Sequence, residues 1–317
     1  MRSSHRTSII AVRCIGVALL VVGVASALVG PLETSVYAQF QEGGAFHYEG
    51  FGFGSLMFAN ITIQIAGYYV IAALCLPLGY GHLKRRWWVR PSMTTLLVDW
   101  LIVGLPLSLL ALMIFVTSKR PGIASLPIMV PVFLLLYPVL PIVLLRFYHS
   151  TRARHVFEIT DAPSNWLSST PQSIRVAASL LVLLALVLHF PLLLGGIFPF
   201  FGEVVAGLVA VVLIAMSIFI TTILAWGVAR RHRWAWWTSI AFLGFLAGSS
   251  TVTFLVRKPH EIMAFMPLAP LEVEALSGLP VQGYQVALLV GLLPTAAIIV
   301  IIVARRAFDP VKKPRSI

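Results

Sequence analysis

Eight long runs of apolar residues constrain this chain more than any other feature of its sequence. A helix needs about 20 residues to cross the hydrocarbon of a bilayer, and the backbone of such a run must satisfy its own hydrogen bonds there. The sequence therefore predicts an all-α, polytopic integral membrane helix bundle with about eight transmembrane helices. The predicted spans lie near residues 9–29, 57–80, 94–117, 124–145, 174–196, 204–228, 235–256 and 284–304.

The composition agrees with a membrane protein. Charged residues are 11% of the chain, whereas a soluble domain has about a quarter. The net charge of +12 does not indicate nucleic-acid binding, because the basic residues lie in short connections and not on one face. The two cysteines, Cys14 and Cys75, both fall inside apolar runs. We therefore expect no disulfide framework, no structural metal and no cofactor.

Two short basic and aromatic segments join neighbouring runs, 146 residues apart. We call residues 81–92 and 227–238 the first and second basic–aromatic turns. Laid over each other without a gap, they share a glycine, a basic pair and a tryptophan. Lys and Arg favour the anionic cytoplasmic headgroups, and Trp favours the headgroup level itself. The predicted interface anchors are Arg85, Arg86, Trp87, Trp88, Arg230, Arg231, Arg233, Trp234, Trp236 and Trp237.

The distribution of basic residues predicts the orientation in the membrane. When the connections are assigned to alternate sides, one side holds all the Lys and Arg residues except Lys119, Arg120, Arg257 and Lys258. Short basic loops stay in the cytoplasm. We therefore expect both termini in the cytoplasm. The expected location is a bacterial inner membrane, and the expected partner is its lipid bilayer with an anionic inner leaflet.

The first apolar run has a second interpretation. Its basic start, the apolar stretch from Cys14 to Val29 and the small residues before Ala38 resemble a secretory signal peptide. Cleavage would leave seven spans and an N-terminus outside. The run is long, and its Ala-x-Ala match at Ala25 and Ala27 lies within the apolar stretch, which favours an uncleaved span.

The longest inner connection, residues 151–172, divides the chain into halves of four spans each, 1–150 and 173–317. The basic–aromatic turns occupy matching places in these halves, and 115–121 resembles 254–259. Both halves run the same way through the membrane, so a duplication would be a parallel repeat. The alternative is that interface composition makes such turns alike. The long outer loops, 30–54 and 257–283, lie at different places in the halves, which weighs against a close duplication.

Local signals predict the shape of the connections. Helix four is expected to continue out of the membrane from Arg146 to Glu158, and 161–165 has the composition of a turn. Thr170 is the predicted cap of helix five, with Pro171 at its first position. Four prolines break the loop at 257–283, with room for one or two helical turns at 271–276. We expect the two outer loops to pack together.

Few polar side chains fall within the spans, and these are the candidate functional residues. Arg13 and Asp99 are predicted to form a structural ion pair, and His189 to hydrogen-bond a neighbouring helix. Asn60 and Gln64 are four residues apart and share a helix face. They either line a polar seam or hydrogen-bond another helix.

No catalytic motif is complete. Ser249, in a Gly-Ser-Ser segment of span seven, has no histidine at a partner position. Residues 84–91 are similar to the first phosphate-binding motif of the membrane acid-phosphatase family, but they are one residue short and no second motif follows. The histidines and acids of the outer loops are either a metal site or solvated loop side chains: Glu42, His47, Glu49, His260 and Glu261.

Three functions therefore remain. A non-catalytic accessory or structural subunit, packing against a protein partner or a second copy, fits the lack of buried charge and of a catalytic set. A transporter with a polar cavity between the halves fits the possible repeat and the prolines of spans three and four. The third is a membrane-embedded enzyme acting on lipid.

Overall fold

The computed structural model describes residues 2–117, 126–158, 169–277 and 281–308. Within these ranges, eight helical segments are long and apolar enough to cross a membrane. The predicted all-α bundle with about eight spans is confirmed, and the protein is a multi-pass membrane protein. The spans are Thr7–Phe40, Leu56–Leu83, Val89–Met113, Met129–His149, Gln172–Leu193, Gly207–Ala229, Arg233–Val256 and Gly283–Phe308.

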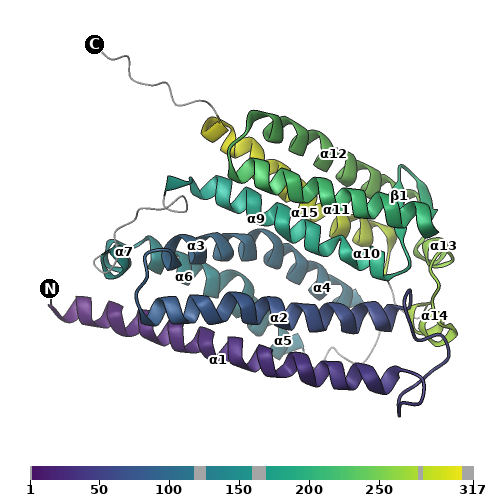
Figure 1. Cartoon of the computed structure of the whole chain (residues 1–317), viewed down its shortest axis with the longest axis horizontal. Coiled ribbons are helices and arrows are strands. Elements are labelled where there is room, and N and C mark those ends of the chain that lie inside the picture. Colours follow the sequence, from purple (N-terminus) through teal and green to yellow (C-terminus); the bar gives the residue numbers. More distant parts are fainter. Residues whose placement is uncertain (1, 118–125, 159–168, 278–280, 309–317) are drawn as a thin grey trace.

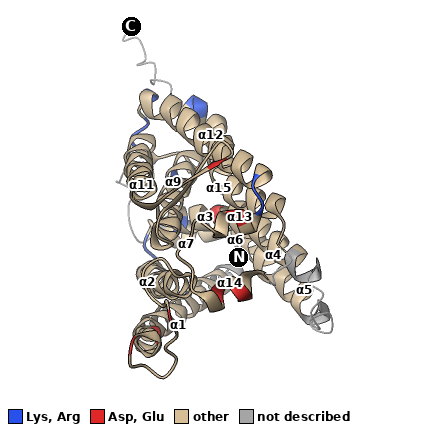
Figure 2. Ribbon diagram, turned by 90° about the vertical axis from the view of Figure 1, so that its right-hand side faces the viewer, with Lys and Arg blue, Asp and Glu red and all other residues tan. Residues whose placement is uncertain are grey.

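The helices form three layers (Figures 1 and 2). One layer is the hairpin of α1 (Arg2–Phe40) and α2 (Leu56–Leu83). The middle layer contains α3 (Val89–Asp99) and α6 (Leu140–His149). The third layer is a four-helix bundle, whose members are α9 (Gln172–Val187), α11 (Gly207–Ala229), α12 (Arg233–Val256) and α15 (Gly283–Val303).

The two ends of this assembly differ in character. At one end, which we call the basic end, lie the start of α1, α7 (Thr151–Glu158), both basic–aromatic turns and η4 (Ala304–Phe308) (Figure 1). At the other, the loop end, lie α13 (Pro259–Met263), α14 (Pro270–Ser277) and a β-hairpin. Figure 2 looks onto this loop end and shows acidic residues gathered there.

Helix α1 packs closely along α2 because three glycines spaced seven residues apart face it. A Cβ at Gly16, Gly23 or Gly30 would lie 2.7, 2.9 or 3.0 Å from α2 side-chain atoms. The helix also runs to Phe40, so the prediction that residues 30–40 belong to a loop was wrong. The aromatic residues of this segment continue the contact between α1 and α2. The ring of Tyr37 packs edge-on against that of Phe58 of α2, with 5.7 Å between the ring centroids.

The second half of the chain encloses the larger hydrophobic core. Leu180 of α9, Ile214 of α11, Leu243 of α12 and Ile301 of α15 are fully buried in one cluster. A β-hairpin that the sequence did not predict covers the loop end of this core. Its strands, β1 (Ile197–Phe200) and β2 (Glu203–Ala206), follow α10 (His189–Leu193) and pair in antiparallel register.

Two spans of the first half contain π-helical segments, whereas α11, α12 and α15 of the second half are continuous helices. Between α3 and α4 (Leu105–Thr117) lies a π-helical segment, η1 (Trp100–Gly104). Another, η3 (Leu135–Val139), separates α5 (Leu126–Leu134) from α6 and contains Pro138. Proline cannot continue the α-helical hydrogen-bond ladder, which accounts for the second interruption.

Two predicted helix boundaries at the central connection were wrong. Helix four does not continue to Glu158, because Ser150 adopts an extended conformation between α6 and α7. The Ser150 hydroxyl donates to the carbonyl of Phe147 and accepts from the N–H of Ala153, so it links the two helices across the break. Helix α9 begins with Pro171 at its N-cap, one position later than predicted, and Thr170 is not its cap. The predicted turn at 161–165 lies outside the described residues.

Candidate functional site

The two basic–aromatic turns have the same backbone conformation. Arg85 and Arg231, at equivalent positions, both lie in the left-handed region, with φ of 51° and 59°. In each turn the next residue's N–H donates to the carbonyl of the shared glycine, at 2.8 Å to Gly81 and 2.9 Å to Gly227. These are helix C-terminal caps of the Schellman type. The sequence match therefore reflects one repeated local structure.

The shared glycine and tryptophan have a packing role. A Cβ at Gly81 would lie 2.9 Å from the ring of Trp88, and one at Gly227 would lie 2.9 Å from that of Trp234. Each glycine thus lets the ring of the following helix close over the turn.

The predicted interface anchors differ in exposure. Among the tryptophans, Trp237 is 67% exposed and Trp234 is 45% exposed, whereas Trp236 is only 9% exposed. The Trp236 indole donates to the carbonyl of Ile301 at 2.9 Å and lies beneath Arg305. Trp236 is therefore part of the contact between α12 and α15, and headgroup contact stays a prediction for the others. Arg86, Arg230, Arg231 and Arg233 are exposed, and Arg85, Trp87 and Trp88 are half-buried.

A buried histidine and tyrosine lie beside the first turn. His82 Nδ1 lies 2.6 Å from the Leu78 carbonyl oxygen, and its Nε2 lies 2.6 Å from the Tyr148 hydroxyl. A carbonyl can only accept, so Nδ1 carries the proton and Nε2 accepts from the tyrosine. Both side chains are fully buried, with Phe157 of α7 against them. This pair joins α2 to α6 at the basic end.

The intramembrane acid Asp99 lies between the two halves. It immediately precedes η1, and it faces Ser179 of α9. Its Oδ1 atom is buried and has no hydrogen-bond partner within the described chain. Arg13 is exposed on α1, and the described structure contains no ion pair between it and Asp99. The predicted Arg13–Asp99 pair is therefore not formed, because the carboxylate faces α9 and not α1.

The other polar candidates lie on exposed helix faces. His189 is exposed, and its Nδ1 bonds the carbonyl of Ala185 one turn earlier at 2.8 Å, so it does not join two helices as predicted. Asn60 and Gln64 are both exposed on α2, as a shared face requires. Within the described part of the chain, neither carboxamide has a hydrogen bond.

A groove of about 620 Å³ opens between the halves. Its walls are formed by α2 and α3 on one side and by α9 and α11 on the other. Most of the lining is apolar, and Asp99, Asn60 and Gln64 are not part of it. The polar lining residues are Trp88, Ser92, Thr95, Arg175 and Trp226 toward the basic end, and Ser179 and Thr222 about one helical turn deeper.

At the loop end, one buried carboxylate holds the two outer loops together. Glu272 of α14 is 7% exposed. Its oxygens accept from the backbone N–H groups of Leu56 at 3.0 Å and Met57 at 2.8 Å, which begin α2, and from the Tyr48 hydroxyl at 2.8 Å. A fourth bond comes from the N–H of Ala269. The predicted packing of the two loops is confirmed, and 271–276 is helical as expected.

The electrostatics of this carboxylate follow from its surroundings. Burial raises the pKa of Glu272, but its hydrogen bonds, led by that from Met57, outweigh burial and hold the pKa below the ordinary value. Burial and the bond to Glu272 raise the pKa of Tyr48. The contact therefore consists of a carboxylate and a neutral phenol, placed at the positive end of the α2 dipole.

A ladder of side chains on α12 holds the β-hairpin. Ser249 and Thr253 are four residues apart and share one face of α12. Arg257, four residues further on, is the C-cap of this helix and has an extended backbone. The Ser249 hydroxyl accepts from the N–H of Phe201 and donates to the carbonyl of Pro199. The Thr253 hydroxyl accepts from the N–H of Gly202 at 3.0 Å.

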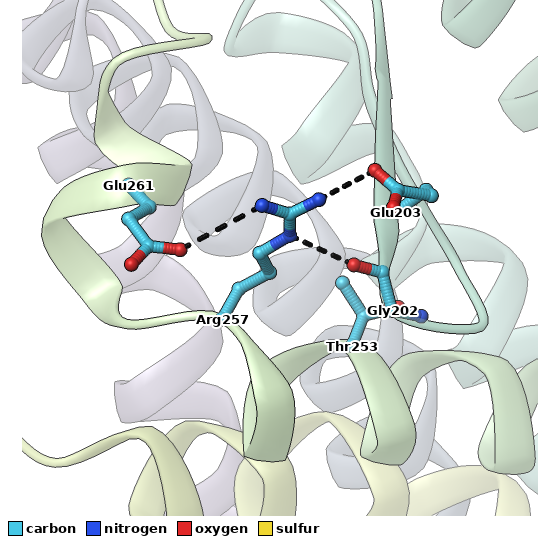
Figure 3. Close-up of polar contacts among 5 residues, drawn as sticks. All are labelled: Gly202, Glu203, Thr253, Arg257 and Glu261. Atoms are coloured by element: carbon cyan, nitrogen blue, oxygen red, sulfur yellow. Dashed lines mark hydrogen bonds and ion pairs between the residues drawn. The ribbon is translucent and has the colours of Figure 1, made fainter.

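Arg257 completes this ladder (Figure 3). Its Nε donates to the carbonyl of Gly202 at 2.8 Å, and its guanidinium pairs with Glu203 at 2.6 Å and with Glu261 at 3.9 Å. Ser249 is therefore occupied by the hairpin backbone, and no histidine accepts its proton. Of the predicted basic residues at this end, Lys119 and Arg120 lie outside the described residues.

Among the described residues, no group of three or more His, Cys, Asp or Glu is placed to hold a metal ion. Compared with known proteins, the chain matches no family model, no curated protein and no solved structure. The class that the geometry defines is a multi-pass helical membrane protein, and any more specific function has to be inferred from its own residues.

Proposed function

We propose that this protein is a non-catalytic accessory or structural subunit that binds a membrane-embedded partner through α2. The observation that carries the proposal is the pair of exposed carboxamides, Asn60 and Gln64, on one face of that helix. The partner is a transmembrane helix of another protein or of a second copy.

The depth of the pair supports a helix as the partner. Gln64 is eight residues from the start of α2, about 12 Å at about 1.5 Å per residue. Helix α2 has 28 residues, about 42 Å, and exceeds the hydrocarbon thickness of about 30 Å. Gln64 therefore lies within the apolar layer if α2 is centred there. A carboxamide left unbonded in hydrocarbon is costly, and hydrogen bonds to a second helix remove that cost.

We further propose that the basic end faces the cytoplasm of a bacterium, with the protein in the inner membrane. Both basic–aromatic turns, the start of the first span and the end of the last span lie at the same end of the molecule (Figure 1). This arrangement supports an even number of membrane crossings. The positive-inside rule then assigns the side. The repeated turn conformation also supports two parallel halves, 1–150 and 173–317, although only the second half packs as a closed four-helix bundle.

The alternatives have weaker support. A transporter needs a polar cavity between the halves, and the groove found there is mainly apolar. An enzyme acting on lipid needs an activated nucleophile, and the Ser249 hydroxyl is bonded to the hairpin.

A photo-crosslinking amino acid placed at position 64 tests the proposal in native membranes. The matched control is position 288 on α15, which is 60% exposed and lies near the same end of its helix. We expect a discrete protein adduct from position 64 and only lipid adducts from position 288. An adduct at twice the protein's mass identifies a second copy, and another mass identifies a different partner. Lipid adducts alone at both positions would contradict the proposal.

A further inference from the structure

Asp99 lies deep within the span Val89–Met113, about 15 Å from its start and about 21 Å from its end at about 1.5 Å per residue. A shift of the span by a few residues therefore leaves the carboxyl group in the apolar layer. Among the described residues, two side-chain polar atoms are buried without a hydrogen-bond partner, Asp99 Oδ1 and Ser239 Oγ. Buried polar atoms are nearly always bonded, and an ionisable group at this depth marks a functional site by default.

No counter-charge faces Asp99 in the described part of the chain. The side chain against it is that of Ser179. The charged residue of α9 is Arg175, one turn nearer the basic end. Neither η1 nor α15, which contacts it, contains a charged residue, and Tyr137 of η3 packs against Trp100. The basic residues and histidines of α2, α6 and α7 lie at the basic end: His82, Arg146, His149, Arg152, Arg154 and His155.

The Ser179 hydroxyl suits a neutral acid better than a carboxylate. Its oxygen lies within hydrogen-bond distance of two carbonyls of its own helix, those of Arg175 at 2.9 Å and Val176 at 3.0 Å. A hydroxyl has one hydrogen to donate, so Ser179 can give it to Asp99 only by losing its bond within α9. A carboxylic acid needs no such exchange, because its own O–H can donate to the Ser179 oxygen.

A line of hydroxyl groups leads from the basic end to Asp99. Ser92, Thr95 and Asp99 are spaced three and four residues apart, so they share one face of α3. Ser92, Thr95 and Ser179, which we call the hydroxyl line, all border the groove between the halves. Each hydroxyl donates to a carbonyl of its own helix and keeps oxygen lone pairs for water. The groove's volume of about 620 Å³ far exceeds the about 30 Å³ of one water molecule, so water has room to follow this line.

We propose that Asp99 is a proton-binding site within the membrane. Its carboxyl group is neutral in the folded protein, and the groove admits the proton from the basic end along the hydroxyl line. The site is separate from the proposed partner surface, because neither Asn60 nor Gln64 borders the groove. Its tests therefore do not depend on the proposed partner.

Infrared spectroscopy of the full-length protein in lipid at neutral pH tests the protonation state. The difference spectrum between wild type and Asp99→Asn should contain the carbonyl band of a carboxylic acid, which is distinct from the bands of a carboxylate. Ser179→Ala should move this band to higher frequency, because the acid loses its hydrogen-bond acceptor. Ser108→Ala, in α4 of the same span, is the control and should leave the band in place. Carboxylate bands without an acid band in the difference spectrum would overturn the proposal.

Aspartate labelled with carbon-13 in its carboxyl group gives a second reading that needs no substitution at position 99. The aspartates of the chain are Asp99, Asp161 and Asp309. In the labelled wild-type protein the acid band should move to lower frequency, and its response to Ser179→Ala assigns it to Asp99. If no acid band responds to the label, Asp99 is ionised and the proposal is wrong.

Exchange in D₂O tests the route. The acid band should move to lower frequency as deuterium replaces the proton. Ala178→Phe, which places a ring in the groove, should slow this change, whereas Ala18→Phe, at an exposed position on α1, should not. An unchanged rate in Ala178→Phe, or equal slowing in the two variants, would rule out the groove as the path of the proton.

Discussion

The carboxylate of Glu272 accepts a hydrogen bond from the backbone N–H of Met57 at 2.8 Å, although 215 residues separate them. A residue of the last loop thereby caps the first turn of α2. Because helix starts leave N–H groups unsatisfied, this single side chain ties the loop end of the first half to that of the second.

Glu272→Gln should destabilise the protein. Glutamine retains one acceptor oxygen where the carboxylate offers two, and the charge that strengthens the bonds is lost. The expected cost is about 1.5–3 kcal/mol for bonds to a buried charged group, measured as a lower Tm in detergent. Glu274→Gln, at an exposed position on the same helix, is the control and should leave Tm unchanged.

The same contact predicts a pH dependence. The folded pKa of Glu272 lies below its ordinary value, which is about 4.3. Its stabilisation is thus complete above about pH 4.3 and is lost as pH falls through the lower folded pKa. The protection factors of the Leu56 and Met57 amides, which compare measured with intrinsic exchange at each pH, should fall in that acidic window in wild type. In Glu272→Gln, protection there should be low already at neutral pH, and a wild-type protection profile in this variant would argue against the assignment.

Tyr148→Phe should weaken the basic end. The substitution keeps the ring but leaves the buried Nε2 of His82 without its donor, at a cost of about 1–3 kcal/mol. Tm should fall accordingly, and Tyr137→Phe, in η3 of the same span, provides the comparison. Equal Tm values for the two variants would show that the hydrogen bond contributes nothing measurable.

Ser249→Ala should loosen the β-hairpin without unfolding the bundle. The N–H of Phe201 loses its acceptor, so its amide exchange should rise about tenfold, corresponding to about 1.4 kcal/mol. Ser250→Ala, one residue along, should leave this amide unchanged. Unchanged exchange in Ser249→Ala would mean that α12 does not hold the hairpin.

The sequence was sufficient for features that depend on composition along a single segment. Long apolar runs predicted every span, and glycine, basic pair and tryptophan marked both turns. It was insufficient where burial depends on distant segments. In the sequence, Glu272 cannot be distinguished from a solvated loop acid, because its burial depends on the position of α2. His82 likewise cannot be distinguished from the basic residues beside it, because its burial depends on contact with Tyr148.

The hairpin and the end of α1 show a different limit. Residues 197–206 are a short apolar run, and such runs suit a strand or a helix end equally well. The only local signal for the hairpin was Gly202, next to Phe201 in a positive-φ turn. Helix α1 passes Pro31 and continues to Phe40 because aromatic packing on α2 sustains it, which no pattern within residues 30–40 indicates.

Cysteine accessibility in intact cells tests the membrane topology most directly. In a variant lacking Cys14 and Cys75, single cysteines replace Arg86 and His232 at the basic end and Glu42 and Glu274 at the loop end. A membrane-impermeant maleimide should label positions 42 and 274 in intact cells and positions 86 and 232 only after permeabilisation. Labelling of position 86 or 232 from outside would contradict the proposed eight-span arrangement with both turns in the cytoplasm.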